Sequence, residues 1–104
     1  MRKAMLYKKK LQDERGREYV LCYSLVIHAT ENGRVYGAEI EKTAESGQQE
    51  RSLLCGVSES REETQRFIKN LWVGSALPSE LDAIYDDFIG AKEWQESRGI
   101  SAAC

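Results

Sequence analysis

The sequence is short of the residues and motifs that usually reveal a chemical activity. It has a single histidine, His28, and three cysteines, Cys22, Cys55 and Cys104, whose wide spacing fits neither a Cys-x-x-Cys redox pair nor a zinc knuckle. No glycine-rich phosphate loop, Gly-x-Ser-x-Gly elbow or His-Glu-x-x-His helix occurs. We therefore expect no cofactor, no bound metal and no enzymatic activity.

Long apolar runs and a secretion signal are missing as well. No run reaches the about 18 apolar residues of a transmembrane helix. The longest run, Tyr19 to Ala29, is interrupted by Ser24 and His28 and is rich in β-branched and aromatic residues, which favours a buried strand. The basic N-terminus is not followed by the apolar segment of a signal peptide. We expect a cytoplasmic protein without membrane contact.

Composition and length are those of a globular protein. The chain has 104 residues, of which 41% are hydrophobic and 31% charged. We expect one α+β domain over residues 1–96 and a flexible C-terminal tail at 97–104. Residues 1–18 hold seven basic and three acidic side chains, whereas residues 59–96 hold nine acidic and four basic ones. This asymmetry can guide a charged partner, or two copies of the chain, toward each other.

Asn32-Gly33 predicts a β-hairpin, because this pair is favoured at the centre of a two-residue type I′ turn. Strands folded back on this turn pair Leu25 with Ile40 and Ile27 with Ala38. One face of the hairpin is then apolar. A slip of one residue would reverse every side chain, so the pattern indicates which face meets the core.

Ser46-Gly47 predicts a second hairpin. A two-residue loop there places three residues of the next strand on the same apolar face: Leu53, Cys55 and Val57. An earlier strand from Met5 to Leu11 precedes a turn at residues 13–17, in which Gly16 is expected to have a positive φ. The result is a four-stranded antiparallel meander in the order 1-2-3-4.

Two amphipathic helices are expected after the strands. Ser60, with Glu63 three residues later, forms a capping-box pattern, and Ser58 is an alternative N-cap. Gly74 fits the C′ position of the first helix, and Pro78 fits the first turn of the second. Packing both helices on the apolar sheet face completes a ββββαα arrangement.

Three short segments resemble a known family. They are Val35-Tyr36-Gly37-Ala38-Glu39-Ile40-Glu41-Lys42, Val57-Ser58 and the segment from Leu77 to Phe88. Over about Tyr23 to Ile89 the chain resembles a family of small uncharacterised bacterial proteins, clostridia-like in origin, catalogued as a domain of unknown function. The resemblance implies a compact bacterial protein and brings no activity, ligand or catalytic residue.

The opposite side of the sheet, here called the second face, is a candidate interaction surface. It is expected to carry six residues: Val20, Cys22, Val26, His28, Glu39 and Leu54. This is more apolar than a fully hydrated face, so a second copy, a partner protein or the C-terminal segment with Trp94 is expected to cover it. His28 and Glu39 lie diagonally in the predicted register, and such a pair could act as a general base.

The lysines at the N-terminus suggest an alternative. Lys8, Lys9 and Lys10 follow Tyr7, and a basic patch beside an aromatic ring can contact a phosphate backbone. Alternate lysines of a strand face opposite sides, and lysine also protects exposed edge strands. A second basis for binding is the acidic second helix, which could dock on a basic partner. The sequence predicts a non-enzymatic interaction or regulatory module, homodimeric or bound to another protein, with nucleic-acid binding as the alternative.

Overall fold

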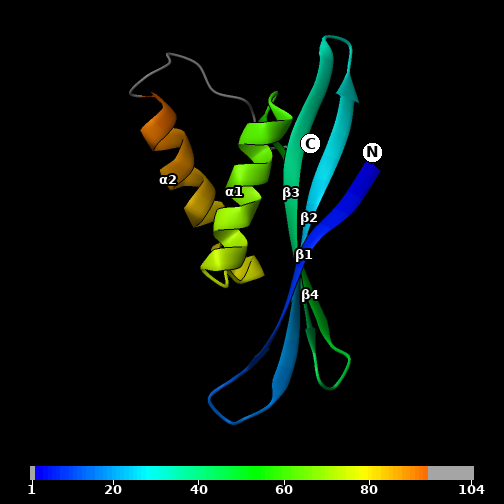
Figure 1. The fold of residues 1–104 in the computed structure, drawn as a ribbon, viewed down its shortest axis with the longest axis vertical. Helices are drawn as coiled ribbons and strands as arrows, with labels where there is room; N and C mark the ends of the chain where they lie inside the picture. The colour runs from blue at the N-terminus through cyan, green and yellow to red at the C-terminus, as the bar shows by residue number, and fades with distance from the viewer. Residues whose placement is uncertain (1, 94–104) are drawn as a thin grey trace.

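The strands run back and forth as a single antiparallel sheet, and both helices cover one of its faces (Figure 1). The computed structural model describes residues 2–93. The strands, in spatial order, are β1 (Arg2–Gln12), β2 (Glu18–Thr30), β3 (Gly33–Ala44) and β4 (Gln49–Ser58). The helices are α1 (Arg61–Val73) and α2 (Leu81–Glu93), and the short 3₁₀ helix η1 (Pro78–Glu80) precedes α2. The predicted α+β meander with two following helices is confirmed.

The β1–β2 and β3–β4 turns are both three-residue loops that end in glycine. The N–H of Gly16 (φ 77°) donates to the carbonyl of Asp13 at 2.9 Å, and that of Gly47 (φ 92°) donates to the carbonyl of Ala44 at 2.8 Å. This loop length favours a type I turn followed by a residue of positive φ. The positive φ predicted for Gly16 is confirmed, but the loop predicted at Ser46-Gly47 is one residue too short.

The longer β3–β4 loop changes which leucine of β4 faces the core. Ala38 pairs with Leu54 rather than with Cys55, and Glu39 pairs with Leu53. Leu54 is therefore buried at 3% exposure, whereas Leu53 lies on the second face and is 38% exposed. The predicted core position of Leu53 and second-face position of Leu54 are wrong, because a slip of one residue reverses the side chains of a strand.

A bulge at Gly37 changes the β3–β4 register again. Tyr36 pairs with Ser58, so three residues of β4 lie opposite Gly37 alone. Cys55 and Val57 are both buried within this stretch, as predicted. A Cβ added at Gly37 would lie 2.8 Å from the carbonyl carbon of Cys55, so the close approach of the two backbones requires glycine.

The β2–β3 turn is centred on Glu31-Asn32 and not on Asn32-Gly33. The hydroxyl Oγ1 of Thr30 accepts from the N–H of Asn32 at 3.3 Å and donates to the carbonyl of Gly33 at 3.0 Å. These bonds hold the turn one residue earlier than predicted. Within the turn only Gly33 has a positive φ, 125°, so the predicted type I′ turn is wrong.

The earlier turn moves the β2–β3 pairing by two residues but leaves both faces unchanged. Leu25 pairs with Ala38, and Tyr23 pairs with Ile40. All four side chains are fully buried, at 0% exposure. The predicted apolar face is confirmed although its pairs differ, because the side chains of a strand alternate with a period of two.

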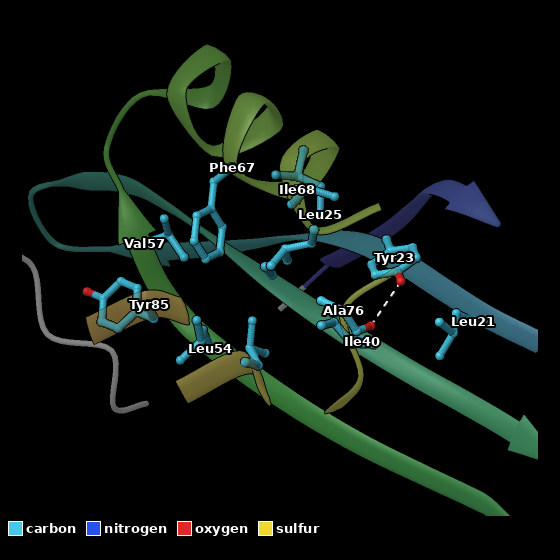
Figure 2. Close-up of a cluster of buried hydrophobic side chains, with 13 residues drawn as sticks. Leu21, Tyr23, Leu25, Ile40, Leu54, Val57, Phe67, Ile68, Ala76 and Tyr85 are labelled. Atoms are coloured by element: carbon cyan, nitrogen blue, oxygen red, sulfur yellow. Dashed lines mark hydrogen bonds between the residues drawn. The ribbon is translucent and has the colours of Figure 1, made fainter. Parts of the chain in front are cut away.

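The apolar face and the helices enclose the core (Figure 2). Its buried members include Leu21, Tyr23, Leu25, Ile40, Leu54 and Val57 from the sheet, Phe67, Ile68 and Leu71 from α1, and Ala76, Leu81 and Tyr85 from the following segments. The hydroxyl of Tyr23 donates to the carbonyl of Ala76 at 2.9 Å, the dashed line in Figure 2. This bond ties the connection after α1 to β2 and satisfies the polar end of a buried ring.

Both ends of α1 have defined caps. Ser60 is the N-cap, since its hydroxyl accepts from the N–H of Glu63 at 3.2 Å. At the other end the N–H of Ser75 donates to the carbonyl of Trp72 at 3.1 Å, and Ser75 has a φ of 54°. Gly74 has a φ of −85°. The C′ position predicted for Gly74 therefore belongs to Ser75.

Pro78 begins η1, in the first turn of the second helical segment as predicted. Within residues 2–93, neither helix combines the length and the apolar character that crossing a lipid bilayer requires. The predicted tail at residues 97–104 lies outside the described residues.

Candidate functional site

The second face is less open than the sequence suggests. Five of the six predicted residues lie on it: Val20, Cys22, Val26, His28 and Glu39. At its centre Val26 is 1% exposed and Glu39 is 7% exposed. Both α1 and α2 lie against the other face (Figure 1). The segment with Trp94, one of the predicted covers of the second face, lies outside the described residues.

The predicted pair of His28 and Glu39 is not formed. His28 pairs with Val35, whereas Glu39 pairs with Ser24, four residues back along β2 and roughly 13 Å away at the usual rise of a strand. The carboxylate of Glu39 instead accepts from Lys3 Nζ at 2.9 Å. The arrangement of His28 beside Glu39 that could act as a general base is therefore absent from the described residues.

Acidic residues of the second face are likewise held by basic neighbours. Arg51 donates to the Glu41 carboxylate at 3.0 Å, as Lys3 does to Glu39. Over residues 2–93 no group of three or more potential ligands could hold a metal ion. These pairs favour a structural role for the carboxylates over cation binding.

The three lysines of the predicted basic patch do not share one surface. Lys8 and Lys10 lie on the second face, and Lys9 lies on the core face. Lys10 Nζ is 2.8 Å from the carboxylate of Glu18, and the hydrogen bond between them raises the pKa of Lys10. Lys9 Nζ donates to the carbonyl of Trp72 at 2.7 Å. Two of the three ammonium groups are thus engaged within the chain.

A polar hollow lies where the two long hairpins extend beyond the helices (Figure 1). Its volume is about 240 Å³, and its lining includes Arg17, Glu18, Lys42 and Glu45. Lys42 Nζ lies 4.8 Å from the centre of the Tyr19 ring. Four acidic and two basic residues line this hollow, but Asp13 and Glu18 are already paired with Arg17 and Lys10, which leaves little net charge to select a ligand of one sign.

A more apolar hollow, here called the helix groove, lies between α1 and the η1–α2 segment. Its volume is about 250 Å³, and its lining residues are Phe67, Asn70, Leu71, Gly74, Ala76, Glu80, Ile84 and Phe88. The sequence pattern places the apolar members on the core-facing stripes of two helices. It does not predict that the helices leave a space between them.

Two of the residues that line the helix groove, Phe67 and Phe88, are aromatic, and Tyr85 packs beside them. The rings of Phe67 and Phe88 have centroids 5.0 Å apart, and those of Phe67 and Tyr85 meet edge to face at 6.4 Å. Phe67 and Tyr85 are buried, while Ile84 and Phe88 are only partly buried. The groove therefore presents aliphatic and aromatic surface to the outside of the helix layer.

The surroundings of the helix groove are polar on the α2 side. Glu80 lines the groove and is exposed, and exposed Asp87 follows Ile84 by three residues, whereas Asp82 and Asp86 lie on the side of α2 away from the groove. On the α1 side Val73 is 63% exposed and Asn70 is exposed as well. An apolar floor beside charged residues is the usual anatomy of a small protein-binding site.

The comparisons with known proteins place the chain in a family but assign it no chemistry. The model of a family of unknown function, DUF6514, matches residues 2–91, and the chain belongs to this family. No curated protein and no solved structure matches the chain. The resemblance found from the sequence is confirmed at the level of the family, whereas the bacterial origin it implied stays a prediction.

Proposed function

We propose that this protein is a non-enzymatic module that binds another protein through the helix groove. The observation that carries the proposal is a groove between the helices whose lining includes Ile84 and Phe88, two apolar side chains that are only partly buried. Exposed apolar surface in a concave site is a recognised sign of association.

The size of the groove favours side chains as its ligands. Pockets for cofactors and drug-sized molecules usually enclose about 300–1,000 Å³. At about 250 Å³ the helix groove is smaller. One or two apolar side chains of a partner would fill it, and anchors of this kind carry most of the energy of a protein interface.

The other two surfaces considered from the sequence support binding less well. Val26 and Glu39 at the centre of the second face are already buried, so a homodimer there would depend on separate exposed side chains such as Met5 and Leu53. Lys9 and Lys10 are engaged within the chain, which weakens the electrostatic basis for nucleic-acid binding.

A blocking substitution at Gly74 tests the proposal. Gly74 lines the groove, and its φ of −85° suits any side chain. A Cβ there would meet only the carbonyl oxygen of Asn70, at 3.5 Å, an ordinary contact. Gly74→Trp should therefore fill the mouth of the groove without backbone strain. Gly90→Trp is the matched control, since Gly90 lies in α2 with nothing near its Cβ position and does not line the groove.

The measurement is a quantitative pull-down from the native cell with wild type and both variants. We expect wild type and the control variant Gly90→Trp to capture the same partner in equal amounts. The variant Gly74→Trp should not capture it. Equal retention by all three proteins would place the interface elsewhere. Recovery of the chain itself as the partner would identify a homodimer through the groove.

A further inference from the structure

We infer that the partner segment is a basic amphipathic helix with its apolar side in the helix groove. This inference rests on the proposed function and adds the chemistry of the partner to it. Two features of the groove carry it, namely the spacing of its apolar residues and the charge beside it.

The apolar lining is spaced for a third helix. Phe67 and Leu71 are four residues apart on α1, and Ile84 and Phe88 are four apart on α2. Residues separated by four lie one above the other on a helix, so each helix presents a row of apolar side chains to the groove. The two helices lie side by side (Figure 1). An amphipathic helix with apolar residues at i and i+3 or i+4 packs its ridge into such a groove.

The charge beside the groove is acidic along α2. Glu80 lines the groove four residues before Ile84, and Asp87 follows Ile84 by three residues on the same side of the helix. From residue 80 to residue 91 the chain has four acidic residues and no basic one. A partner with lysine or arginine on the side that meets α2 would match Glu80 and Asp87, whereas acidic residues on that side would be repelled.

Three synthetic peptides separate the two features. The first peptide has about 18 residues, which is long enough for an alanine-rich sequence to form a helix in water. Leucine stands at i, i+3, i+4 and i+7, lysine flanks the leucine side of the helix, and alanine fills the remaining positions. The second replaces each lysine with glutamate, and the third replaces each leucine with serine. Each peptide is titrated into the full chain by calorimetry at low salt and again at about 0.15 M salt.

We expect the lysine–leucine peptide to bind at least about tenfold more tightly than either of the others. Asp87→Lys should weaken peptide binding roughly fivefold. The charge-matched control is Glu14→Lys, at an exposed residue of the β1–β2 turn, and should leave binding unchanged. Gly74→Trp should weaken binding of the lysine–leucine peptide, and Gly90→Trp should leave it unchanged.

The outcomes distinguish this inference from the proposed function. Equal or tighter binding of the glutamate–leucine peptide would overturn the basic partner while leaving the groove as a protein site. If no peptide binds but Gly74→Trp still loses the partner in the pull-down, the inference of a helical partner segment is overturned and the groove remains a protein-binding site. Peptide binding that both charge-reversed proteins lose equally would mean attraction to net charge rather than to α2.

Discussion

Lys9 of β1 caps the C-terminus of α1 through the carbonyl of Trp72. Its ammonium donates to that oxygen at 2.7 Å and to the hydroxyl of Ser75 at 2.9 Å. The last turn of α1 has no basic residue of its own. A lysine from a distant strand therefore supplies the positive charge that the negative end of a helix dipole favours. Tyr7 of the same strand stacks on the Trp72 ring with centroids 4.8 Å apart, which holds the strand and the helix end together.

Removing the ammonium of Lys9 should destabilise the protein. Lys9→Met keeps the length of the side chain but removes the charged donor to the Trp72 carbonyl and to the Ser75 hydroxyl, leaving the N–H of Ser75 on that carbonyl, at a cost of about 1 kcal/mol in the free energy of unfolding. Lys8→Met is the matched control, because Lys8 is exposed on the second face, and should change it by less than about 0.5 kcal/mol. Urea denaturation of both variants measures the difference. Equal effects would refute the capping role.

The bulge at Gly37 predicts opposite effects for two glycine substitutions. Gly37→Ala drives a methyl group into the backbone of β4 and should lower the free energy of unfolding by about 2–3 kcal/mol. Gly90→Ala, within α2 and in open space, should raise it by about 0.5–1 kcal/mol. Thermal melts of the two variants test this contrast. A tolerated Gly37→Ala would mean that β3 and β4 do not approach so closely.

The C-terminus of α1 offers a similar test of its C′ residue. Gly74→Ala should raise the free energy of unfolding by about 0.4–1 kcal/mol, because a φ of −85° suits alanine. Ser75→Ala should lower it by about 1 kcal/mol, because the hydrogen bond from Lys9 is lost at a position of positive φ. The reverse order in chemical denaturation would restore Gly74 to the C′ position.

Tyr23 predicts a loss of stability at alkaline pH. Burial, followed by the charges of Tyr19 and Glu80, raises the pKa of Tyr23 to about 12, above an ordinary value of 10.0. The folded protein holds this proton more tightly than the unfolded chain does. The contribution of the protonated Tyr23 hydroxyl to the free energy of unfolding is therefore complete below about pH 10 and is lost as the pH rises toward 12. The stability advantage of wild type over Tyr23→Phe should therefore shrink across that range in urea titrations. A constant difference would contradict the burial of the hydroxyl.

The turn positions predicted the strand order, and alternation of apolar residues predicted the buried face of β2 and β3. That face depends on a period of two, which survives a two-residue shift of the pairing. Alternation did not predict the face of Leu53 and Leu54. That outcome depends on whether the loop after Ala44 has two residues or three, and Ser46-Gly47 suits both lengths. The capping of α1 by Lys9 could not be predicted from local sequence patterns either, since it joins residues 63 positions apart.

The candidate site was harder to predict than the fold. Apolar stripes on two helices indicate which sides are buried, but the space between those helices depends on how each one sits on the sheet. The second face was predicted as the interaction surface from side-chain types alone, and the burial of Val26 there could not be read from a strand pattern. The acidic character of α2 was visible in the sequence, and the groove now places part of it beside an apolar floor.

The most direct test of a protein-binding helix groove is to locate the lysine–leucine peptide on the chain by nuclear magnetic resonance. Titration into uniformly ¹⁵N-labelled protein reports each backbone amide separately. Binding in the groove predicts saturable shift changes at residues 67–74 and 80–88, lost in Gly74→Trp and kept in Gly90→Trp. Shift changes confined to β1 or to the second face, or the same changes in Gly74→Trp, would show that the peptide does not bind in the helix groove.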